Sequence, residues 1–167
     1  MKLYIVENWM EKADLKELKS KGAMQVVQNV IGNIQIAKCL DGKPYVVNDS
    51  KYINWSHNEK YLVIALSESG QIGVDLEVDN LQYDEKLHGW VLNNGEKVEI
   101  EKGRCFAEVW TRKEAILKYT GEGLSEKMCE FNSYDLTDLH VMTVFRFGLC
   151  ISICTEKKET IELFHII

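Results

Sequence analysis

Two acidic side chains lie two residues apart in a segment of strand-forming residues. Residues 72–78 read IGVDLEV, with an apolar residue at every even position. Because side chains alternate along a strand, Asp75 and Glu77 share one face and lie roughly 7 Å apart. Two carboxylates in that arrangement could hold a divalent cation, which prefers oxygen ligands and would relieve their repulsion. The polar outer face of a half-buried strand explains the same pattern, so both interpretations stay open.

A second group of candidate side chains lies in a segment with helical spacing. Steps of four residues place Trp110, Glu114 and Lys118 in one stripe, so that a carboxylate and an ammonium lie side by side near an indole. An ordinary surface ion pair, worth about 0.2–0.5 kcal/mol, has the same spacing. From these residues alone, a functional role and a surface pair are both open.

A strand and a helix must position these two groups. Residues 61–66 and 72–78 are rich in strand formers, and the glycine-containing turn between them predicts an antiparallel hairpin. Apolar residues recur every three or four positions over residues 104–119, and Gly121 follows as a stop signal, which predicts a helix. Gly73 interrupts its strand, and a glycine there indicates that another backbone or a ligand comes close.

The other predicted elements complete a mixed architecture. Residues 22–40 carry apolar residues at helical spacing and predict one helix with a buried face. Residues 79–101 are polar and predict short helices. Strands are expected at residues 2–7 and in a three-strand meander at residues 140–147, 149–155 and 160–167. This order of elements predicts an α+β fold.

Composition restricts the class of protein. The chain has 167 residues, a length typical of one compact domain, and no apolar run approaches the ~20 residues of a membrane helix. Its start lacks the pattern of a signal peptide, so we expect a cytoplasmic protein. We also expect the protein to be a monomer. A net charge of -6 argues against broad binding to nucleic acid or anionic membranes. The five cysteines include no CxxC pair and are expected to be free thiols.

The chain shows no internal boundary of the kind that separates independent domains. It has one proline and no Gly/Ser-rich linker, low-complexity tract or long run of charge. We therefore expect a single folding unit over residues 1–167, with an N-terminal half at 1–70 and a C-terminal half at 71–167.

The two motifs together resemble the signature of the 4'-phosphopantetheinyl transferases. That signature corresponds to IGVDLE at residues 72–77 followed by FAEVWTRKEAILK at 106–118. The 37 residues from Glu77 to Glu114 suit the surfactin-synthetase-activating (Sfp-type) branch. Further matches are GKP at residues 42–44, NWSH at 54–57 and GEGLS at 121–125. The resemblance covers residues 42–125, about half of the chain.

This resemblance implies a fold and a set of site residues. The family fold has two similar α+β halves related by a pseudo-twofold axis, each a long helix packed on an antiparallel sheet, with coenzyme A in the cleft between them. Magnesium, with manganese as an alternative ion, would be bound by Asp75, Glu77 and Glu114, and Glu96 is a weaker candidate. Lys118 would contact the pyrophosphate of coenzyme A. The adenosine and its 3'-phosphate would be held by Lys43, Ser56 and His57.

The resemblance also implies a reaction. The family transfers the 4'-phosphopantetheine group of coenzyme A to a serine of an apo acyl or peptidyl carrier protein and releases 3',5'-ADP. Asp75, Glu114 and Lys118 would be the catalytic residues, and either Glu114 or a metal-bound water would accept the serine proton. Trp110 is interpreted as a core residue that anchors its helix.

The N-terminal region departs from the pattern of the Sfp-type branch. It is abbreviated before Gly42, and none of its lysines at positions 12, 16, 19 and 21 matches the basic residues with which that branch binds the 3'-phosphate. An alternative function is therefore a degenerate family member that binds coenzyme A or a carrier protein without catalysis. Another magnesium-dependent nucleotide-binding protein is a third possibility, but the chain lacks the GxxxxGK[ST] and GxGxxG motifs.

Overall fold

The computed structural model describes residues 1–13, 19–32, 34–40, 42–123 and 126–167. Three residues named above, Lys16, Leu124 and Ser125, lie outside these ranges. The chain divides into two compact units, one formed by Met1–Ile72 with Glu159–Ile167 and the other by Gly73–Lys158. Each unit combines helices with a β-sheet, which confirms the predicted α+β class.

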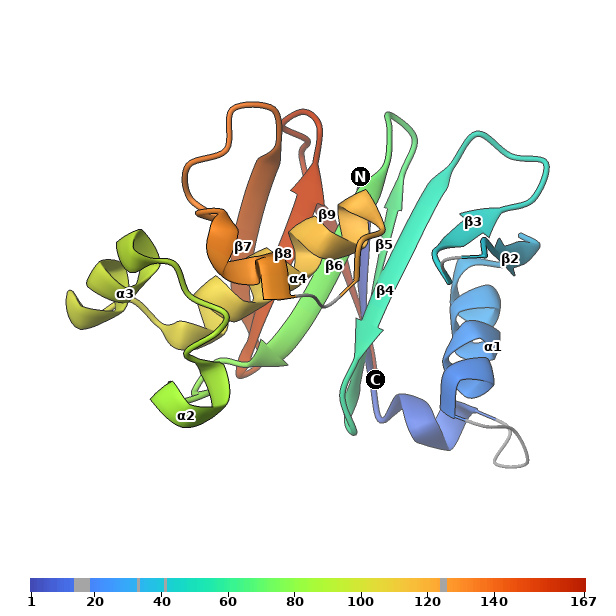
Figure 1. Ribbon diagram of the computed structural model, residues 1–167. Coiled ribbons are helices and arrows are strands. Elements are labelled where there is room, and N and C mark those ends of the chain that lie inside the picture. The colour runs from blue at the N-terminus through green and yellow to red at the C-terminus, as the bar shows by residue number, and fades with distance from the viewer. Residues whose placement is uncertain (14–18, 33, 41, 124–125) are drawn as a thin grey trace. The chain divides into compact units, whose positions relative to one another are not determined.

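The first unit contains a four-stranded sheet in the order β4-β5-β1-β9 (Figure 1). Its strands are β1 (Lys2–Glu7), β4 (Tyr52–His57), β5 (Tyr61–Ser67) and β9 (Glu162–Ile166). β1 and β4 both pair antiparallel to β5, and β9 pairs parallel to β1. The first strand therefore begins and ends where the sequence predicts.

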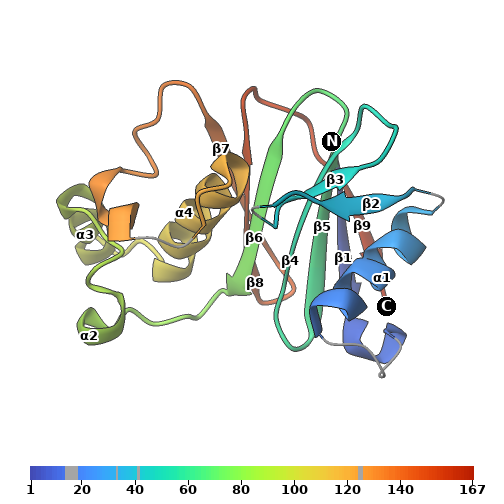
Figure 2. The ribbon, with the colours of Figure 1, turned by 45° about the vertical axis from the view of Figure 1, so that its right-hand side comes forward.

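One face of this sheet carries the core of the first unit. The helix α1 (Lys19–Ile31) buries Val26 and Val27 against it, together with Trp9 from the short helix η1 (Trp9–Lys12). A small two-stranded sheet, β2 (Ile36–Lys38) and β3 (Pro44–Val46), contributes to the same core. Figure 2 shows α1, β2 and β3 on the same side of the four-stranded sheet.

The second unit contains a three-stranded sheet in the order β6-β8-β7. These strands are β6 (Ile72–Val78), β7 (His140–Arg146) and β8 (Leu149–Thr155). The helices are α2 (Glu85–His88), α3 (Asn94–Glu101), α4 (Phe106–Thr120) and the short η2 (Glu126–Glu130). The predicted helix over residues 104–119 and the short helices within 79–101 are confirmed, and Gly121 ends α4 with a φ of 84°.

The predicted hairpin between residues 61–66 and 72–78 is wrong, although both strands exist. A strand has two hydrogen-bonding edges, and β4 and β1 take both edges of β5. β6 pairs instead with β8. The burial of β5 along almost its whole length explains this result, because such a strand needs a neighbour on each side.

The predicted meander at the end of the chain is also only partly correct. β7 and β8 form the expected hairpin, whose turn at Phe147 and Gly148 has positive φ at both residues. β9, however, pairs with β1, where Tyr4 lies opposite Phe164 and their rings stack at 4.9 Å. The buried strand β1 has β5 on one edge, and β9 fills the other.

The helix predicted over residues 22–40 is shorter than expected. α1 ends at Ile31, and Gly32 adopts a φ of 71°, a left-handed conformation that stops helices. The chain then continues into β2. None of the helices in the described ranges is long and apolar enough to cross a membrane.

Gly73 determines how closely α4 lies against β6. A Cβ atom at this position would stand 2.0 Å from the carbonyl oxygen of Ala115 and 2.5 Å from the backbone nitrogen of Tyr119. Both atoms belong to the backbone of α4, which cannot yield as a flexible side chain does. The prediction that another backbone approaches Gly73 is therefore confirmed, and the face of β6 that carries Gly73 is the face toward α4.

We predict that Gly73→Ala lowers the free energy of unfolding by about 2–3 kcal/mol, because the added methyl group must push α4 away from β6. The comparison variant is Gly70→Ala, where a Cβ would meet no atom within 4 Å, so its stability should change by no more than about 0.5 kcal/mol. Urea denaturation followed by circular dichroism measures both. Equal stability of the two variants would show that the contact does not restrain α4.

Candidate active site

The close contact at Gly73 brings Asp75 of β6 to the C-terminal half of α4. Asp75 lies two residues beyond Gly73 and so shares its face. The ammonium Nζ of Lys118, on α4, donates a hydrogen bond to Oδ1 of Asp75 at 2.6 Å. Asp75 is buried, whereas Lys118 remains partly exposed. The structure therefore joins two of the predicted site residues directly.

Glu114 lies one turn before Lys118 on α4 and is 9% exposed. Its Oε1 atom is buried without a hydrogen-bond partner. Burial, together with the negative charge of Asp75, raises the pKa of Glu114 from its ordinary 4.5 to about 7, against the opposing positive charge of Lys118. Glu114, Asp75 and Lys118 thus form one electrostatically coupled group.

This group fits a magnesium ion by the chemistry of its donors. Asp75 and Glu114 supply the carboxylate oxygens that magnesium prefers, and the unpartnered Oε1 of Glu114 would gain a counter-charge. In the part of the chain described here, no group of three or more His, Cys, Asp or Glu side chains is already arranged around one point. Magnesium commonly uses one or two protein carboxylates together with water and substrate phosphates, which suits a pair of acids.

Glu77 is not part of that pair in this structure. Its Oε1 accepts a hydrogen bond from the backbone nitrogen of Val78 at 2.8 Å. By strand alternation it shares the face of Asp75, one step further along β6. Its assignment as a third ligand remains a prediction.

Glu96 is structural, which corrects its assignment as a weaker metal candidate. It is fully buried, and its Oε2 pairs with Nζ of Lys113 at 2.8 Å. Backbone nitrogens of Asn93 and Ser133 donate to its two oxygens at 3.1 and 2.9 Å. With both oxygens bound inside the fold, Glu96 has no exposed lone pair to offer an ion.

Lys113 has a role that the sequence did not reveal. Its ammonium is fully buried, binds Glu96 and donates to the carbonyl oxygens of Met128 and Phe131. Burial lowers the pKa of Lys113, and its contact with Glu96 opposes that shift. A lysine before a glutamate is too common to signal such a network, and only the partners distant in sequence show it.

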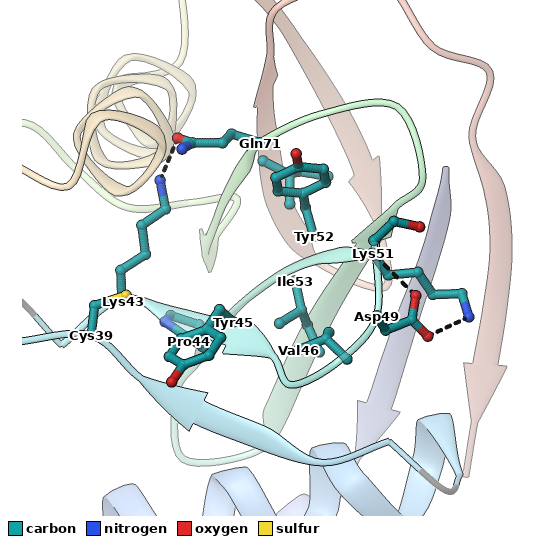
Figure 3. A pocket seen from close by; sticks show the side chains of 12 residues that line it. Cys39, Lys43, Pro44, Tyr45, Val46, Asp49, Lys51, Tyr52, Ile53 and Gln71 are labelled. Carbon is teal, nitrogen blue, oxygen red and sulfur yellow. Dashed lines mark hydrogen bonds and ion pairs between the residues drawn. The ribbon is translucent and has the colours of Figure 1, made fainter.

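The three residues predicted to hold the adenosine end belong to the first unit, where Lys43 lines a cavity whose described lining does not include Ser56 or His57. Nζ of Lys43 donates to Oε1 of Gln71 at 2.9 Å, at the edge of a cavity of about 250 Å³ (Figure 3). Ser56 and His57 are neighbours on β4 and so point to opposite faces. Ser56 is buried, whereas His57 is exposed and its ring lies 4.7 Å from that of Trp9. The cavity is lined by Cys39, Lys43, Pro44, Tyr45, Val46, Asp49, Ser50, Lys51, Tyr52, Ile53, Gln71 and Ile72.

Trp110 packs as the sequence predicts. It lies against a buried cluster that includes Phe106 and Val109, with its ring 6.1 Å from that of Phe106. Its ring also lies 5.9 Å from the imidazole of His88. This environment confirms that Trp110 helps to anchor α4.

We predict that Glu114→Gln stabilises the protein at alkaline pH and leaves its stability unchanged near pH 4. The folded state binds the Glu114 proton more tightly than the unfolded state, so the associated stability is present below about pH 4.5 and is lost as pH rises to about 7. Above pH 7 the variant should gain at most about 3 kcal/mol. Urea denaturation between pH 4 and 8.5 with a chelator measures this difference. The exposed Glu101→Gln is the control, and a parallel pH dependence of both variants would contradict the prediction.

Comparison with known proteins identifies relatives of this sequence. Residues 71–162 match the family described as the 4'-phosphopantetheinyl transferase superfamily, over more than half of the chain. The chain is similar to 4'-phosphopantetheinyl transferase AcpT of Salmonella typhi, 30% identical over 72% of this chain and 66% of that protein. It also resembles a putative 4'-phosphopantetheinyl transferase of Synechocystis, 36% identical over 50% of this chain and 38% of the relative. The 4'-phosphopantetheinyl transferase gsp of Aneurinibacillus migulanus is 28% identical over 62% of this chain and 45% of that protein.

The chain spans slightly less than two thirds of the AcpT protein and smaller shares of the other two relatives. The family match contains β6 and α4, and with them Asp75, Glu114 and Lys118. On the length of this match, the chain belongs to the 4'-phosphopantetheinyl transferase superfamily.

Proposed function

We propose that this protein transfers the 4'-phosphopantetheine group of coenzyme A to a serine of an apo carrier protein and releases 3',5'-ADP. The observation that carries the proposal is the coupled group of Asp75, Glu114 and Lys118, which lies within the segment matching the family. Relatives of this chain carry the name of this activity. We also propose that the protein belongs to the Sfp-type branch of the family and has an abbreviated N-terminal half.

Asp75 and Glu114, with Glu77 as a further candidate, are the residues that would hold magnesium. When bound, the ion would neutralise charge on the pyrophosphate of coenzyme A and on the departing 3',5'-ADP. Phosphoryl transfer needs little covalent chemistry from the protein, so placing charge correctly is the main task of these side chains.

Lys118 and Glu114 have separate tasks in the proposed reaction. Lys118 is partly exposed, so its ammonium could bind a pyrophosphate oxygen of the donor. Glu114 could accept the proton of the carrier serine, directly or through a water molecule. Without a bound ion the pKa of Glu114 is about 7, and a bound cation would lower it and keep the carboxylate ionised, as a proton acceptor must be.

The adenosine end of coenzyme A is assigned to the first unit. Lys43 borders a cavity whose lining includes two half-exposed tyrosines, Tyr45 and Tyr52, which offer flat surfaces for a purine. Ser56 and His57 remain candidates for contacts with the ribose and the 3'-phosphate. A degenerate protein that binds coenzyme A or carrier without transfer is the alternative, and the retained Asp75, Glu114 and Lys118 argue against it.

We predict that the protein modifies an apo carrier protein in the presence of coenzyme A and magnesium. Asp75→Asn and Glu114→Gln should each lower the rate by about 100-fold or more, because each removes a charge needed in the transition state. Intact mass spectrometry of the carrier measures the transfer, and Glu101→Gln should match the wild type. A wild-type protein that binds coenzyme A but leaves a panel of acyl and peptidyl carriers unmodified would favour the degenerate alternative.

We further predict that Lys43→Ala weakens the preference for coenzyme A over dephospho-coenzyme A about tenfold or more, since a charge-assisted hydrogen bond is lost. The kcat at saturating donor should change little, because ground and transition states share this contact. Lys118→Ala should lower kcat with both donors instead. Steady-state kinetics with each donor measures these effects, and Lys60→Ala, which removes a lysine paired with Glu7, is the control. Equal losses with both donors for Lys43→Ala would remove Lys43 from the 3'-phosphate site.

A further inference from the structure

Thr111 places a hydroxyl group at the contact between α4 and the sheet, three residues before Glu114. The side chain is fully buried. Its Oγ1 donates to the carbonyl oxygen of Ala107 at 2.8 Å, within α4. The same oxygen lies 2.8 Å from Oγ of Ser152 and 3.5 Å from Sγ of Cys150, both buried residues of β8. A short polar side chain thus joins the helix to the central strand.

The hydroxyl protons in this cluster can be assigned by counting donors. Thr111 has a single hydroxyl proton. The carbonyl oxygens of Ala107 and Glu108, at 2.8 and 3.3 Å, can only accept that proton, so Thr111 must accept the proton of Ser152. Ser152 has then used its own proton, and Thr143 of β7, at 3.0 Å, must donate to Ser152. The result is one directed chain of hydrogen bonds that runs from β7 through β8 to α4.

Cys150 completes the environment of Thr111 without competing for its proton. Burial raises the pKa of Cys150 to about 12, so the thiol stays protonated and can donate weakly to Thr111. The Thr111 oxygen then has partners for its proton and for both lone pairs. Because Thr111, Ser152 and Cys150 are fully buried, water cannot replace a lost bond as it would at the surface.

The helix α4 contacts the sheet at two points that lie on two different strands. Thr111 holds the helix on β8, and the backbone from Ala115 to Tyr119 rests on Gly73 of β6. A helix that slips by one residue turns by about 100°. Such a slip would carry Glu114 and Lys118 away from Asp75, which lies in the same strand as Gly73.

Arg112, the neighbouring anchor, is less suited to fix this register. Its guanidinium donates to the carbonyl oxygens of Val141 and Ser133 at 3.0 and 2.7 Å. A long side chain with several rotatable bonds can keep those contacts while the helix backbone shifts. The Thr111 hydroxyl is attached to Cβ, so its hydrogen bond transmits the position of the backbone directly.

We propose that Thr111, through its hydrogen bond to Ser152, is a positioning residue that sets the register of α4 so that Glu114 and Lys118 face Asp75. The structural part of this proposal concerns the geometry of the fold alone. The effect of Thr111 on catalysis rests on the proposed function.

The test measures the coupling between Asp75 and Lys118 in different backgrounds. A double-mutant cycle with Asp75→Asn and Lys118→Met is carried out by urea denaturation in a chelator, in the wild type and in Thr111→Val, which keeps the shape but lacks the hydroxyl. Thr111→Ser restores the hydroxyl, and Ser152→Ala removes the same bond from the strand side. Val109→Ala, a buried truncation on the same helix, controls for general loss of stability.

We expect the coupling to change the unfolding equilibrium constant by about fivefold in the wild type, Thr111→Ser and Val109→Ala. In Thr111→Val and Ser152→Ala the coupling between Asp75 and Lys118 should disappear, so that it changes the unfolding equilibrium constant by a factor of about one. Unchanged coupling in those two variants would overturn the proposal, as would absence of coupling in the wild type. If Thr111→Val fails to fold, Ser152→Ala decides the question.

Kinetics form the second arm of the test. Thr111→Val should lower kcat about tenfold or more with little change in KM for coenzyme A, because it misplaces catalytic groups without touching the donor, and Thr111→Ser should restore kcat. A wild type without transferase activity would refute the proposed function, while the coupling cycle would still decide the role of Thr111. Loss of coupling with an unchanged kcat would overturn the catalytic part of the inference.

Discussion

The contact between Gly73 and the backbone of α4 is the constraint on which the candidate site depends. With any side chain at position 73, the helix would have to lie further from β6. The 2.6 Å contact between Lys118 and Asp75, the burial of Glu114 and its raised pKa all require this short separation. One missing Cβ atom thus converts an ordinary helix-on-sheet packing into a site where charges interact strongly.

Of the four consecutive residues from Thr111 to Glu114, the first three anchor α4 within the fold and the fourth is a candidate functional group. Thr111 bonds to β8, Arg112 binds backbone carbonyls, and Lys113 is neutralised by Glu96 inside the fold. Each satisfies the requirement that buried polar groups find partners, although the Nε of Arg112 is an exception. Of these four residues, Glu114 is the one with a buried oxygen that lacks a hydrogen-bond partner, and its raised pKa marks it as a candidate functional group.

The sequence predicts the parts of this site that depend on local spacing and misses those that depend on distant partners. The alternation in residues 72–78 and the helical spacing before Gly121 correctly indicate β6 and α4, and the glycine at 73 signals a close approach. Strand pairing was predicted poorly, because β5 and β9 find partners according to which edges remain open across the whole sheet. Glu96 could not be recognised as structural, since the burial that makes it so comes from Lys113 and Ser133.

The charges of the site would let Lys118 change its partner from Asp75 to an anionic donor when a cation binds to the carboxylates. Lys118 offsets the charge of the buried Asp75 and, being partly exposed, can also meet a ligand from solvent. A bound cation would take over the task of neutralising Asp75 and Glu114, and the ammonium of Lys118 would then be available to a phosphate oxygen. Asp75 and Lys118 would each keep a counter-charge throughout, which avoids the large cost of leaving a buried ion unpaired, and Glu114 would gain one. On this view, the buried acid Glu114 is the residue that gains most when the cation and the donor bind together.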